Sequence, residues 1–408
     1  MLCFVDDVVV DYKTSEVKPT LDYLKYGLSM QLPSYLYLTN KSNLFDNIKY
    51  CGFYLQHILD NEIKIEDLII EDLGDIREET VALREHYNFT RQKILQFSID
   101  LYNCYDKDNR MFFTVTGKGM PIQKRRYWFS ESFAVVGSAE LYRATKEEKY
   151  LINARETLDT LLKVKKGIIK TEPKFNPEAV NTISLASPMI LLITCQILRE
   201  IDVERVDYYN QIIDESIEEI KLHYHPECKA MFENVNPDGS LVSGSRGRFV
   251  NPGHSIEASW FIMDEAAYRN NDPELLDLAL NILNYSFELG WDKEYGGLLY
   301  FVDVENKPVQ ALEWDMKLWW PHNEMLIAFL KAYHLTNDEQ YLEKYKLVHD
   351  YTFSHFKDEV YGEWYGYLRR DGSISTDLKG NIFKGPFHIP RCELENILQI
   401  KKILEKNT

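Results

Sequence analysis

The chain has 408 residues, of which 45% are hydrophobic and 27% charged, a composition typical of a globular protein with a large core. Its formal net charge of −17 argues against nucleic acids and anionic membranes as partners, since both require a basic surface. No apolar run reaches the ~18–20 residues of a membrane span. The acidic opening MLCFVDDVVVDYK and the absence of a CxxC pair predict a cytoplasmic protein without a secretory signal, a disulfide framework or a cysteine zinc site.

Apolar residues recur at helical spacing from the middle of the chain to its end. This periodicity predicts helices at residues 126–145, 146–165, 185–201, 203–223, 253–270, 273–289, 319–336, 338–356 and 391–405. The tight joints between neighbouring helices carry helix-start residues, such as Thr145 and Asp272-Pro273. The longer links contain short β-like runs broken by Gly, Pro or Asp-Gly, which predicts a hairpin in each link.

Repetition of a helix pair followed by a long link predicts one all-α domain over residues 1–408. About six such pairs would close into an (α/α)6 barrel of inner and outer helices, with the hairpin-bearing links walling a pocket at one end. A helical solenoid is the alternative, but the links are too long and irregular for a regular repeat array. Residues 1–103 fit the pattern less well, and we expect atypical or incomplete first repeats there, with an acidic insertion near 59–92.

One candidate catalytic residue is His254, which follows a helix start made by Asn251 and Pro252. Glu257 lies three residues further on and shares its helix face, so we expect this carboxylate to orient the imidazole or raise its basicity. A position in the first turn also predicts that the helix dipole lowers the pKa of His254. On its own, a histidine at this place equally fits a capping or surface residue.

A second cluster is Trp319-Trp320-Pro321, followed by His322 and Glu324. Adjacent tryptophans before polar groups indicate a pocket rim on which a sugar ring could stack. An aromatic core with a solvated first turn explains the same pattern, and the composition leaves both interpretations open.

A third candidate is His388, which lies in a short segment held by Pro386 and Pro390. A rigid backbone around a titratable group is typical of functional sites. No HExxH, GxSxG or phosphate-loop motif occurs in the chain, so we expect no catalytic metal, serine nucleophile or nucleotide loop.

These candidates lie in longer motifs that occur in a fixed order along the chain. The motifs are Asn251-Pro252-Gly253-His254 with Glu257-Ala258, Trp291-Asp292 with Gly296-Gly297, Lys317-Leu318-Trp319-Trp320-Pro321-His322 with Glu324, Tyr361-Gly362-Glu363-Trp364 with Gly366-Tyr367-Leu368, and Lys384-Gly385 with Phe387-His388-Ile389-Pro390-Arg391. In these motifs the chain resembles the N-acylglucosamine 2-epimerase family, most closely its animal members. The similarity runs from about Phe112 to Arg391 and includes Arg126 and Glu131.

The resemblance implies the (α/α)6 barrel and the interconversion of N-acetylglucosamine and N-acetylmannosamine, an isomerase reaction of amino-sugar and sialic acid metabolism. It assigns the proton transfers at C2 of the ring-opened sugar to His254 and His388, and pocket roles to Glu257 and Glu324. It implies no redox cofactor and no metal, with ATP or another nucleotide as an activator rather than a reactant. It further implies a homodimer.

The chemistry explains why two histidines would be needed. The aldehyde of the open sugar acidifies the C2 proton, which must leave on one face and return on the other, and imidazole populates both protonation states near neutral pH. We predict that aromatic rings and the charged or polar groups of the shared motifs hold the sugar. These substrate-binding residues are Trp319, Trp320, Trp364, His322, Arg126, Glu131 and Arg391.

One departure from the family pattern supports an alternative function. The family carries a motif close to Lys-Tyr-x-x-x-Gln-x-Arg, whereas Lys25-Tyr26 is followed here by GLSMQLP without the arginine. A weak or inactive homologue that binds sugars or renin-like proteases is therefore an alternative. A glycoside hydrolase on the same barrel is another, and it would need two carboxylates roughly 5–10 Å apart across a glycosidic bond. That reaction would leave both histidines without a role.

Overall fold

The computed structural model describes residues 102–406, with gaps at 117–118, 174–175, 177, 179, 382 and 386, together with an N-terminal strand pair. That pair is β1 (Leu2–Val5) and β2 (Val8–Asp11), which run antiparallel. The predicted acidic insertion near 59–92, and nearly all of the predicted atypical repeats at 1–103, lie outside the described residues. One domain over 1–408 stays a prediction.

The described residues fall into two compact units. The first contains Thr182–Met189 and Ile217–Thr408, and the second contains the described residues from 102 to Asn181 together with Ile190–Ser216.

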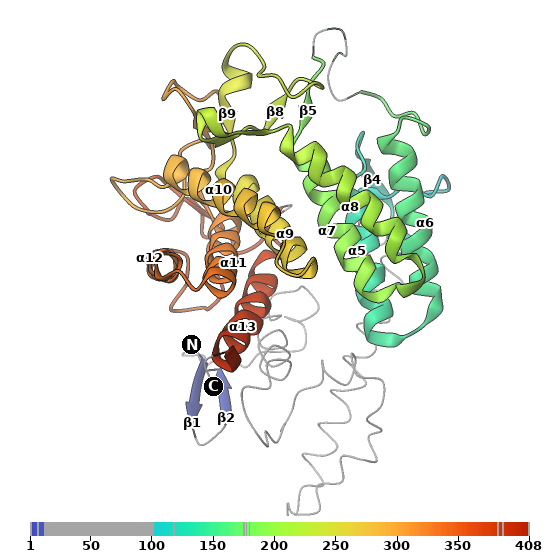
Figure 1. The fold of residues 1–408 in the computed structure, drawn as a ribbon. Coiled ribbons are helices and arrows are strands. Elements are labelled where there is room, and N and C mark those ends of the chain that lie inside the picture. Colours follow the sequence, from blue (N-terminus) through green and yellow to red (C-terminus); the bar gives the residue numbers. More distant parts are fainter. Residues whose placement is uncertain are drawn as a thin grey trace, which may run out of the picture. The chain divides into compact units, whose positions relative to one another are not determined.

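Every helix predicted from periodicity is confirmed, with its ends shifted by a few residues (Figure 1). The helices are α5 (Phe129–Thr145), α6 (Glu148–Lys165), α7 (Ala186–Ile201), α8 (Val206–Lys221), α9 (Pro252–Tyr268), α10 (Pro273–Gly290), α11 (Trp319–Thr336), α12 (Glu339–His355) and α13 (His388–Lys406). Asp272 acts as the predicted cap, because its side chain accepts hydrogen bonds from backbone N–H groups of α10, and Asp338 caps α12 in the same way. The prediction for Thr145 is wrong, because Thr145 is the last residue of α5 and the N-cap of α6 is Glu147, whose side chain makes no capping bond.

In the first unit, inner helices alternate with outer ones. Helix α11 packs against α9 and α13 and is buried on nearly every side, from Trp319 to Ala332. Its partner α12 buries only one stripe, formed by Tyr341, Val348, Tyr351 and Thr352. A helix that is apolar all round belongs in a core, whereas a single apolar stripe is typical of a helix at the surface. The pairs α9–α10 and α11–α12 therefore each join an inner helix to an outer one.

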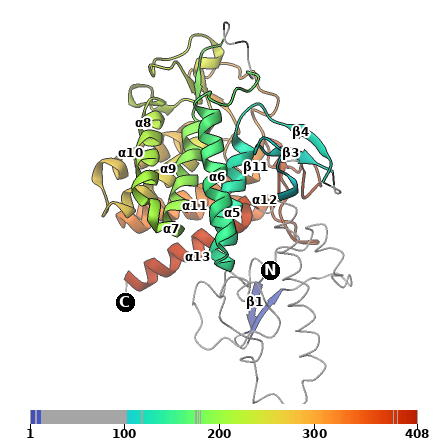
Figure 2. The ribbon, with the colours of Figure 1, turned by 90° about the vertical axis from the view of Figure 1, so that its right-hand side faces the viewer.

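In the second unit, α5 and α6 pack together and lie beside a hairpin of β3 (Phe112–Val115) and β4 (Pro121–Lys124) (Figure 2). A buried ion pair joins the start of this hairpin to α5, with Arg110 Nε 2.5 Å from Glu131 Oε1. The same carboxylate oxygen accepts the Met111 N–H at 2.9 Å. Glu131 is thus bound within its own unit by the chain just before β3.

The prediction of a self-contained hairpin in each long link is partly wrong. The links do fold back at their Asp-Gly turns, where isolated bridges join Val235 to Leu241 and Leu368 to Ile374. Most of their two-residue strands, however, pair with a different link, so that links about 50 residues apart are joined side by side. These pairs are β5 (Ile183–Ser184) with β8 (Asn234–Val235), β9 (Phe249–Val250) with β10 (Val302–Asp303), and β11 (Lys317–Leu318) with β12 (Tyr367–Leu368). Among the described residues, local strand pairs are formed by β6 (Tyr224–His225) with β7 (Ala230–Met231) and by β3 with β4, where the predicted hairpin is confirmed.

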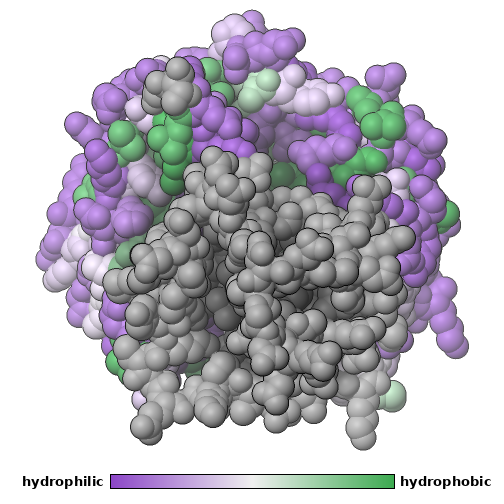
Figure 3. All heavy atoms as spheres, turned by 90° about the horizontal axis from the view of Figure 1, so that it is seen from below, coloured by the Kyte–Doolittle hydropathy of each residue, from purple (hydrophilic) through white to green (hydrophobic). Residues whose placement is uncertain are grey.

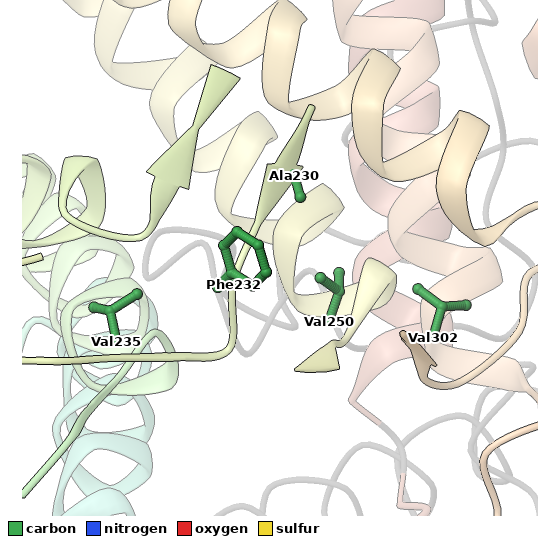
Figure 4. Close-up of a cluster of buried hydrophobic side chains, with 5 residues drawn as sticks. All are labelled: Ala230, Phe232, Val235, Val250 and Val302. Atoms are coloured by element: carbon green, nitrogen blue, oxygen red, sulfur yellow. The ribbon is translucent and has the colours of Figure 1, made fainter. Parts of the chain in front are cut away.

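An apolar cluster is formed by side chains of the links themselves, on and beside strands β7 to β10 (Figures 1 and 4). Its buried members are Ala230, Phe232, Val235, Val250 and Val302. Burying a side chain such as Val or Phe stabilises the fold by about 1.5–3 kcal/mol relative to leaving it exposed. The cluster therefore gives the short strands a rigid floor that their few ladder hydrogen bonds could not supply.

The described surface seen in Figure 3 is mostly hydrophilic, with apolar residues in scattered patches, in keeping with the net charge of −17. Among the described residues, no helix combines the length and apolarity needed to cross a membrane.

Asp292 is expected to be a major source of stability in the first unit. Its carboxylate pairs with Lys317 (Nζ to Oδ2, 3.3 Å), which is fully buried, and with Arg370 (Nε to Oδ2, 3.0 Å). Asp292→Ala leaves the Lys317 ammonium buried without a carboxylate, which should lower the free energy of unfolding by about 3–5 kcal/mol in denaturant titrations. The control Glu359→Ala removes a surface pair with Lys357 and should cost less than about 1 kcal/mol. Equal losses in the two variants would contradict the prediction.

Candidate active site

The N-terminal ends of α9, α11 and α13 meet in the first unit. Trp320, the second residue of α11, touches the ring of His254 from α9 (centroids 5.2 Å apart) and the ring of His388 from α13 (5.6 Å). Because both imidazoles lie against one indole, the two predicted catalytic histidines are neighbours. Each of these helix starts also carries a partial positive charge, so negative charge is favoured where the three ends meet.

Local sequence fixes the position of His254. The Asn251 side chain caps α9 and accepts the His254 N–H at 3.2 Å, as the sequence predicts. A Cβ atom at Gly253 would lie 2.7 Å from the Trp320 ring, closer than real contacts allow. Gly253 therefore lets the indole of Trp320 approach the first turn of α9, beside His254.

The carboxylate bound to His254 is Glu233, not Glu257 as predicted. Glu233 lies between β7 and β8, and its Oε2 is 3.0 Å from Nδ1 of His254. Its backbone is held on both sides, since its N–H donates to the Phe249 carbonyl and its carbonyl accepts the Leu185 N–H. The sequence offers no signal for this pairing, because it depends on how links from separate repeats fold against one another.

The direction of the His254 pKa also differs from the prediction. Burial is the largest influence and disfavours the imidazolium, but attraction to Glu233, the hydrogen bond that His254 donates to that carboxylate and attraction to Glu257 together raise the pKa. The predicted lowering of the pKa by the helix dipole is therefore not the net result, because a carboxylate in direct contact outweighs a partial charge. The predicted effect of Glu257 on the basicity of His254 is among the causes of the rise.

Glu324 holds the second histidine. Its carboxylate is fully buried, and Oε1 accepts from His388 Nδ1 at 2.8 Å and from Arg391 Nη2 at 2.7 Å, while Oε2 accepts from the Trp260 indole at 2.8 Å. Burial alone would raise the pKa of Glu324, but the Arg391 and His388 partners lower it to about 2. Glu324 is accordingly ionised throughout the neutral range.

Arg391 is the cationic centre of this cluster. Its Nη2 also donates to Glu257 Oε1 at 2.6 Å, and its guanidinium lies over the ring of Phe387, 4.7 Å from the centroid. Oxygen and nitrogen atoms of Glu257, Glu324 and His388 all lie within 4.8 Å of one another, a donor set that suits a divalent cation. Because Arg391 already binds both carboxylates, the guanidinium supplies the positive charge that a metal would otherwise bring.

The two carboxylates define how each imidazole can act. Both accept a hydrogen bond at Nδ1, so we assign the Nδ1–H tautomer to the neutral rings, which leaves Nε2 as the proton acceptor. The side chains of His254 and His388 are 28% and 20% exposed. This arrangement can accept a proton at one ring and donate one at the other.

His322 lies outside this cluster. Its ring is fully buried, with Nδ1 donating to the Leu318 carbonyl at 2.7 Å and Nε2 accepting the Leu298 N–H at 3.1 Å. Burial lowers its pKa to about 3, so it stays neutral. Since both ring nitrogens are used by the backbone, the predicted contact of His322 with a sugar does not fit its place in the structure.

Of the three tryptophans predicted to bind the sugar, two are core residues and one lies at the histidine cluster. Trp364 is buried and packs against Phe353 and Phe356, which is a core position. Trp319 is buried too, although the edge of its ring faces His388 at 6.3 Å. Trp320 is the tryptophan that the structure brings against both histidines.

Two predicted ligands, Arg126 and Glu131, belong to the second unit. Arg126 Nη1 donates to the Pro173 carbonyl at 3.0 Å, and Glu131 is fully buried against Arg110. Their contact with a sugar stays a prediction.

Paired inner and outer helices with a histidine–carboxylate cluster at the inner helix ends define an (α/α)6 barrel with its site among the links, and solved structures confirm this class. Cellobiose 2-epimerase from Spirochaeta thermophila matches with a TM-score of 0.65 and 18% identity, covering 92% of this chain and 99% of that one. Cellobiose 2-epimerase from Bacillus thermoamylovorans matches with a TM-score of 0.63 and 20% identity, covering 79% and 82%. The predicted fold class is thus confirmed.

Sequence comparison identifies the family. The model of the N-acylglucosamine 2-epimerase family matches residues 100–389. The N-acylglucosamine 2-epimerases of Mus musculus and Bos taurus are 38% and 39% identical to this chain, each over 69% of it and 67% of their own length. The chain belongs to the N-acylglucosamine 2-epimerase family, whose members are carbohydrate epimerases, and the resemblance seen in the motifs is confirmed.

Gly253→Ala should disturb the site without removing any polar group from it. The added methyl group would push the Trp320 ring away from α9, and a displacement of about 1 Å can cost ~10²-fold in turnover. Steady-state epimerase assays measure the effect. Gly385→Ala is the control, since a Cβ there meets nothing within 4 Å. Equal activity of the two variants would count against the role of Gly253.

His322→Phe should act on stability rather than on sugar binding. The ring volume is kept, but the Leu298 N–H loses its buried acceptor, which should cost about 1–3 kcal/mol at pH 7 in urea unfolding. The folded pKa of about 3 lies below the unfolded value of about 6.5, so the stability from neutral His322 is lost as pH falls through that window. The gap between wild type and variant should therefore narrow by pH 5. A loss of sugar affinity at unchanged stability would restore the original prediction.

Proposed function

We propose that this protein is a sugar 2-epimerase that interconverts N-acetylglucosamine and N-acetylmannosamine by proton transfer at C2 of the ring-opened sugar. The observation that carries the proposal is the pair of imidazoles, His254 and His388, each held at Nδ1 by a carboxylate and both lying against Trp320. Family membership supports epimerisation, and the acyl sugar is the substrate named for the mouse and cattle relatives.

In the proposed reaction, one neutral imidazole takes the C2 proton through Nε2. The electron pair of the broken C2–H bond forms the C1–C2 double bond of an enolate, and the aldehyde oxygen takes the negative charge. The second ring, an imidazolium, returns a proton to the opposite face of C2. Proton gain at one histidine balances proton loss at the other, and no oxidant or reductant takes part.

The electrostatics of the cluster support formation of the enolate. The guanidinium of Arg391 and the N-terminal ends of α9, α11 and α13 place positive charge near the two imidazoles. Glu324 is fixed as an anion that orients His388 rather than as a proton donor. The Trp320 indole offers a face for the sugar, and contacts from Glu257, Trp319, Arg126 and Glu131 remain part of the proposed binding site.

A glycoside hydrolase fits this geometry less well. Its general acid is a carboxyl group with a raised pKa, whereas the pKa of Glu324 is lowered to about 2. Glu257 and Glu324 share one nitrogen of Arg391, and Glu363, another carboxylate of the shared motifs, pairs with Lys384 at 2.6 Å. These carboxylates are therefore bound by cations, and the histidines would have no part in hydrolysis.

The family resemblance adds further properties to the proposal. They are activation by ATP or another nucleotide, a homodimer, a place in cytoplasmic sialic acid metabolism, and binding of a renin-like protease. Size-exclusion chromatography with light scattering tests the dimer, and assays with and without ATP test the activation.

The direct test is to incubate the purified protein with N-acetylmannosamine, with and without ATP, and to follow N-acetylglucosamine by proton NMR. Appearance of the epimer to a fixed equilibrium ratio, reached from either sugar, supports the epimerase. Saturable sugar binding without conversion would instead identify the catalytically inactive alternative.

His254→Ala and His388→Ala should each abolish epimerisation while leaving the fold intact. General acid–base groups contribute about 10²–10⁴-fold each, and inversion needs both. In deuterated solvent the wild type should incorporate deuterium at C2 during turnover, whereas a variant with one remaining imidazole could exchange the proton without inverting the centre. His225→Ala is a matched control, because His225 also binds a carboxylate, Glu227, away from the cluster. Wild-type rates in both site variants would refute the assignment.

A further inference from the structure

The two histidine–carboxylate pairs have nearly the same geometry but different surroundings. The Nδ1-to-oxygen distances are 3.0 Å for His254 with Glu233 and 2.8 Å for His388 with Glu324. The charge of Glu324 is shared with Arg391 at 2.7 Å and with the Trp260 N–H at 2.8 Å. Glu233, by contrast, receives only the Ser184 hydroxyl at 3.4 Å besides His254, among the hydrogen bonds of the described residues.

The groups facing His254 come from several elements. Glu233 from the β7–β8 link contacts Nδ1, Glu257 lies on the same helix, and Trp320 from α11 covers the ring. The charge of Glu257 is neutralised by Arg391, 2.6 Å from its Oε1. The Glu233 side chain is 13% exposed, so solvent screens its charge only in part. Among the described residues, Glu233 is thus the carboxylate beside His254 whose charge no cation neutralises.

We propose that Glu233 is a positioning residue that makes the two histidines unequal, fixing the Nδ1–H tautomer of His254 and keeping His254 protonated in the resting enzyme. This inference rests on the proposed two-histidine function. It assigns a role to a residue that the sequence motifs do not mark, 21 positions before His254 and in a different link.

The asymmetry has a kinetic consequence. A reaction that needs one imidazole and one imidazolium has a bell-shaped pH profile of kcat/KM. The alkaline limb reports the loss of the more tightly held proton, which the proposal places on His254. Because the equilibrium constant between two uncharged sugars does not depend on pH, both directions must share the same limbs. Removing the charge of Glu233 should therefore move the alkaline limb to lower pH, and by the same amount for the forward and the reverse reaction.

The test variant is Glu233→Gln, whose amide oxygen can still accept from Nδ1 but carries no charge. We expect the alkaline limb of its kcat/KM profile to move to lower pH for both the forward and the reverse reaction, while the acid limb stays in place. The thermal unfolding temperature should stay close to that of the wild type. Glu233→Ala, which also removes the acceptor, should lose activity across the whole profile. The matched control is Glu227→Gln, which makes the same change beside His225 and should leave both limbs unchanged.

A second measurement does not depend on activity. Proton–carbon NMR of protein labelled at histidine, with the His254 signal assigned by its absence in His254→Ala, gives the titration of that ring directly. We expect its midpoint to move to lower pH in Glu233→Gln and not in Glu227→Gln. If the midpoint moves but no sugar is epimerised, the proposed function fails while the coupling of Glu233 to His254 stands.

Two outcomes would overturn the inference. One is an unchanged His254 titration in Glu233→Gln, and the other is a lower kcat with both limbs of the pH profile in place, as expected for a merely structural carboxylate.

Discussion

Burying a carboxylate away from water destabilises the fold unless cations or hydrogen-bond donors compensate its charge. Glu324 is fully buried among α9, α11 and α13. The hydrogen bonds of the Glu324 carboxylate join α11 to two other helices. They come from Trp260 on α9 and from His388 and Arg391 on α13. The need to satisfy this one anion therefore fixes how the three helix ends meet. The positions of His388 and Arg391 follow from it.

The links depend on a second constraint, which repeats along the chain. Asp292 and Asp358 each begin a turn, where each accepts two backbone N–H groups, and each binds a cation from a later segment, Arg370 and Lys379 respectively. Such turns brace links that have only two-residue strands. The apolar cluster around Phe232 joins the links that carry β7 to β10. A stiff link is what allows Glu233 to hold the ring of His254.

How much the sequence could predict follows from the range of each interaction. Helices and their caps are local, so periodicity and residues such as Asn251 and Asp272 predict them within a few positions. The cluster of His254, Glu324 and His388 was predictable from motif resemblance and helix starts. The partner of His254 was not, because Glu233 reaches it through strand pairing between links. His322 resembles a site residue in sequence, and only its burial and two backbone bonds show that it is structural.

The same packing that stabilises the site also divides its histidines. Among the residues that the structure describes, three carboxylates, Glu233, Glu257 and Glu324, lie close to two imidazoles, and one guanidinium, that of Arg391, binds two of them. Glu233 is the carboxylate that Arg391 does not bind. His254 therefore has beside it an anion that no described cation compensates, whereas the anion beside His388, Glu324, is compensated by Arg391. A reversible proton transfer needs one protonated and one neutral base at any moment. Unequal carboxylates make that mixed state the resting state, where two equal histidines would spend much of their time both protonated or both neutral.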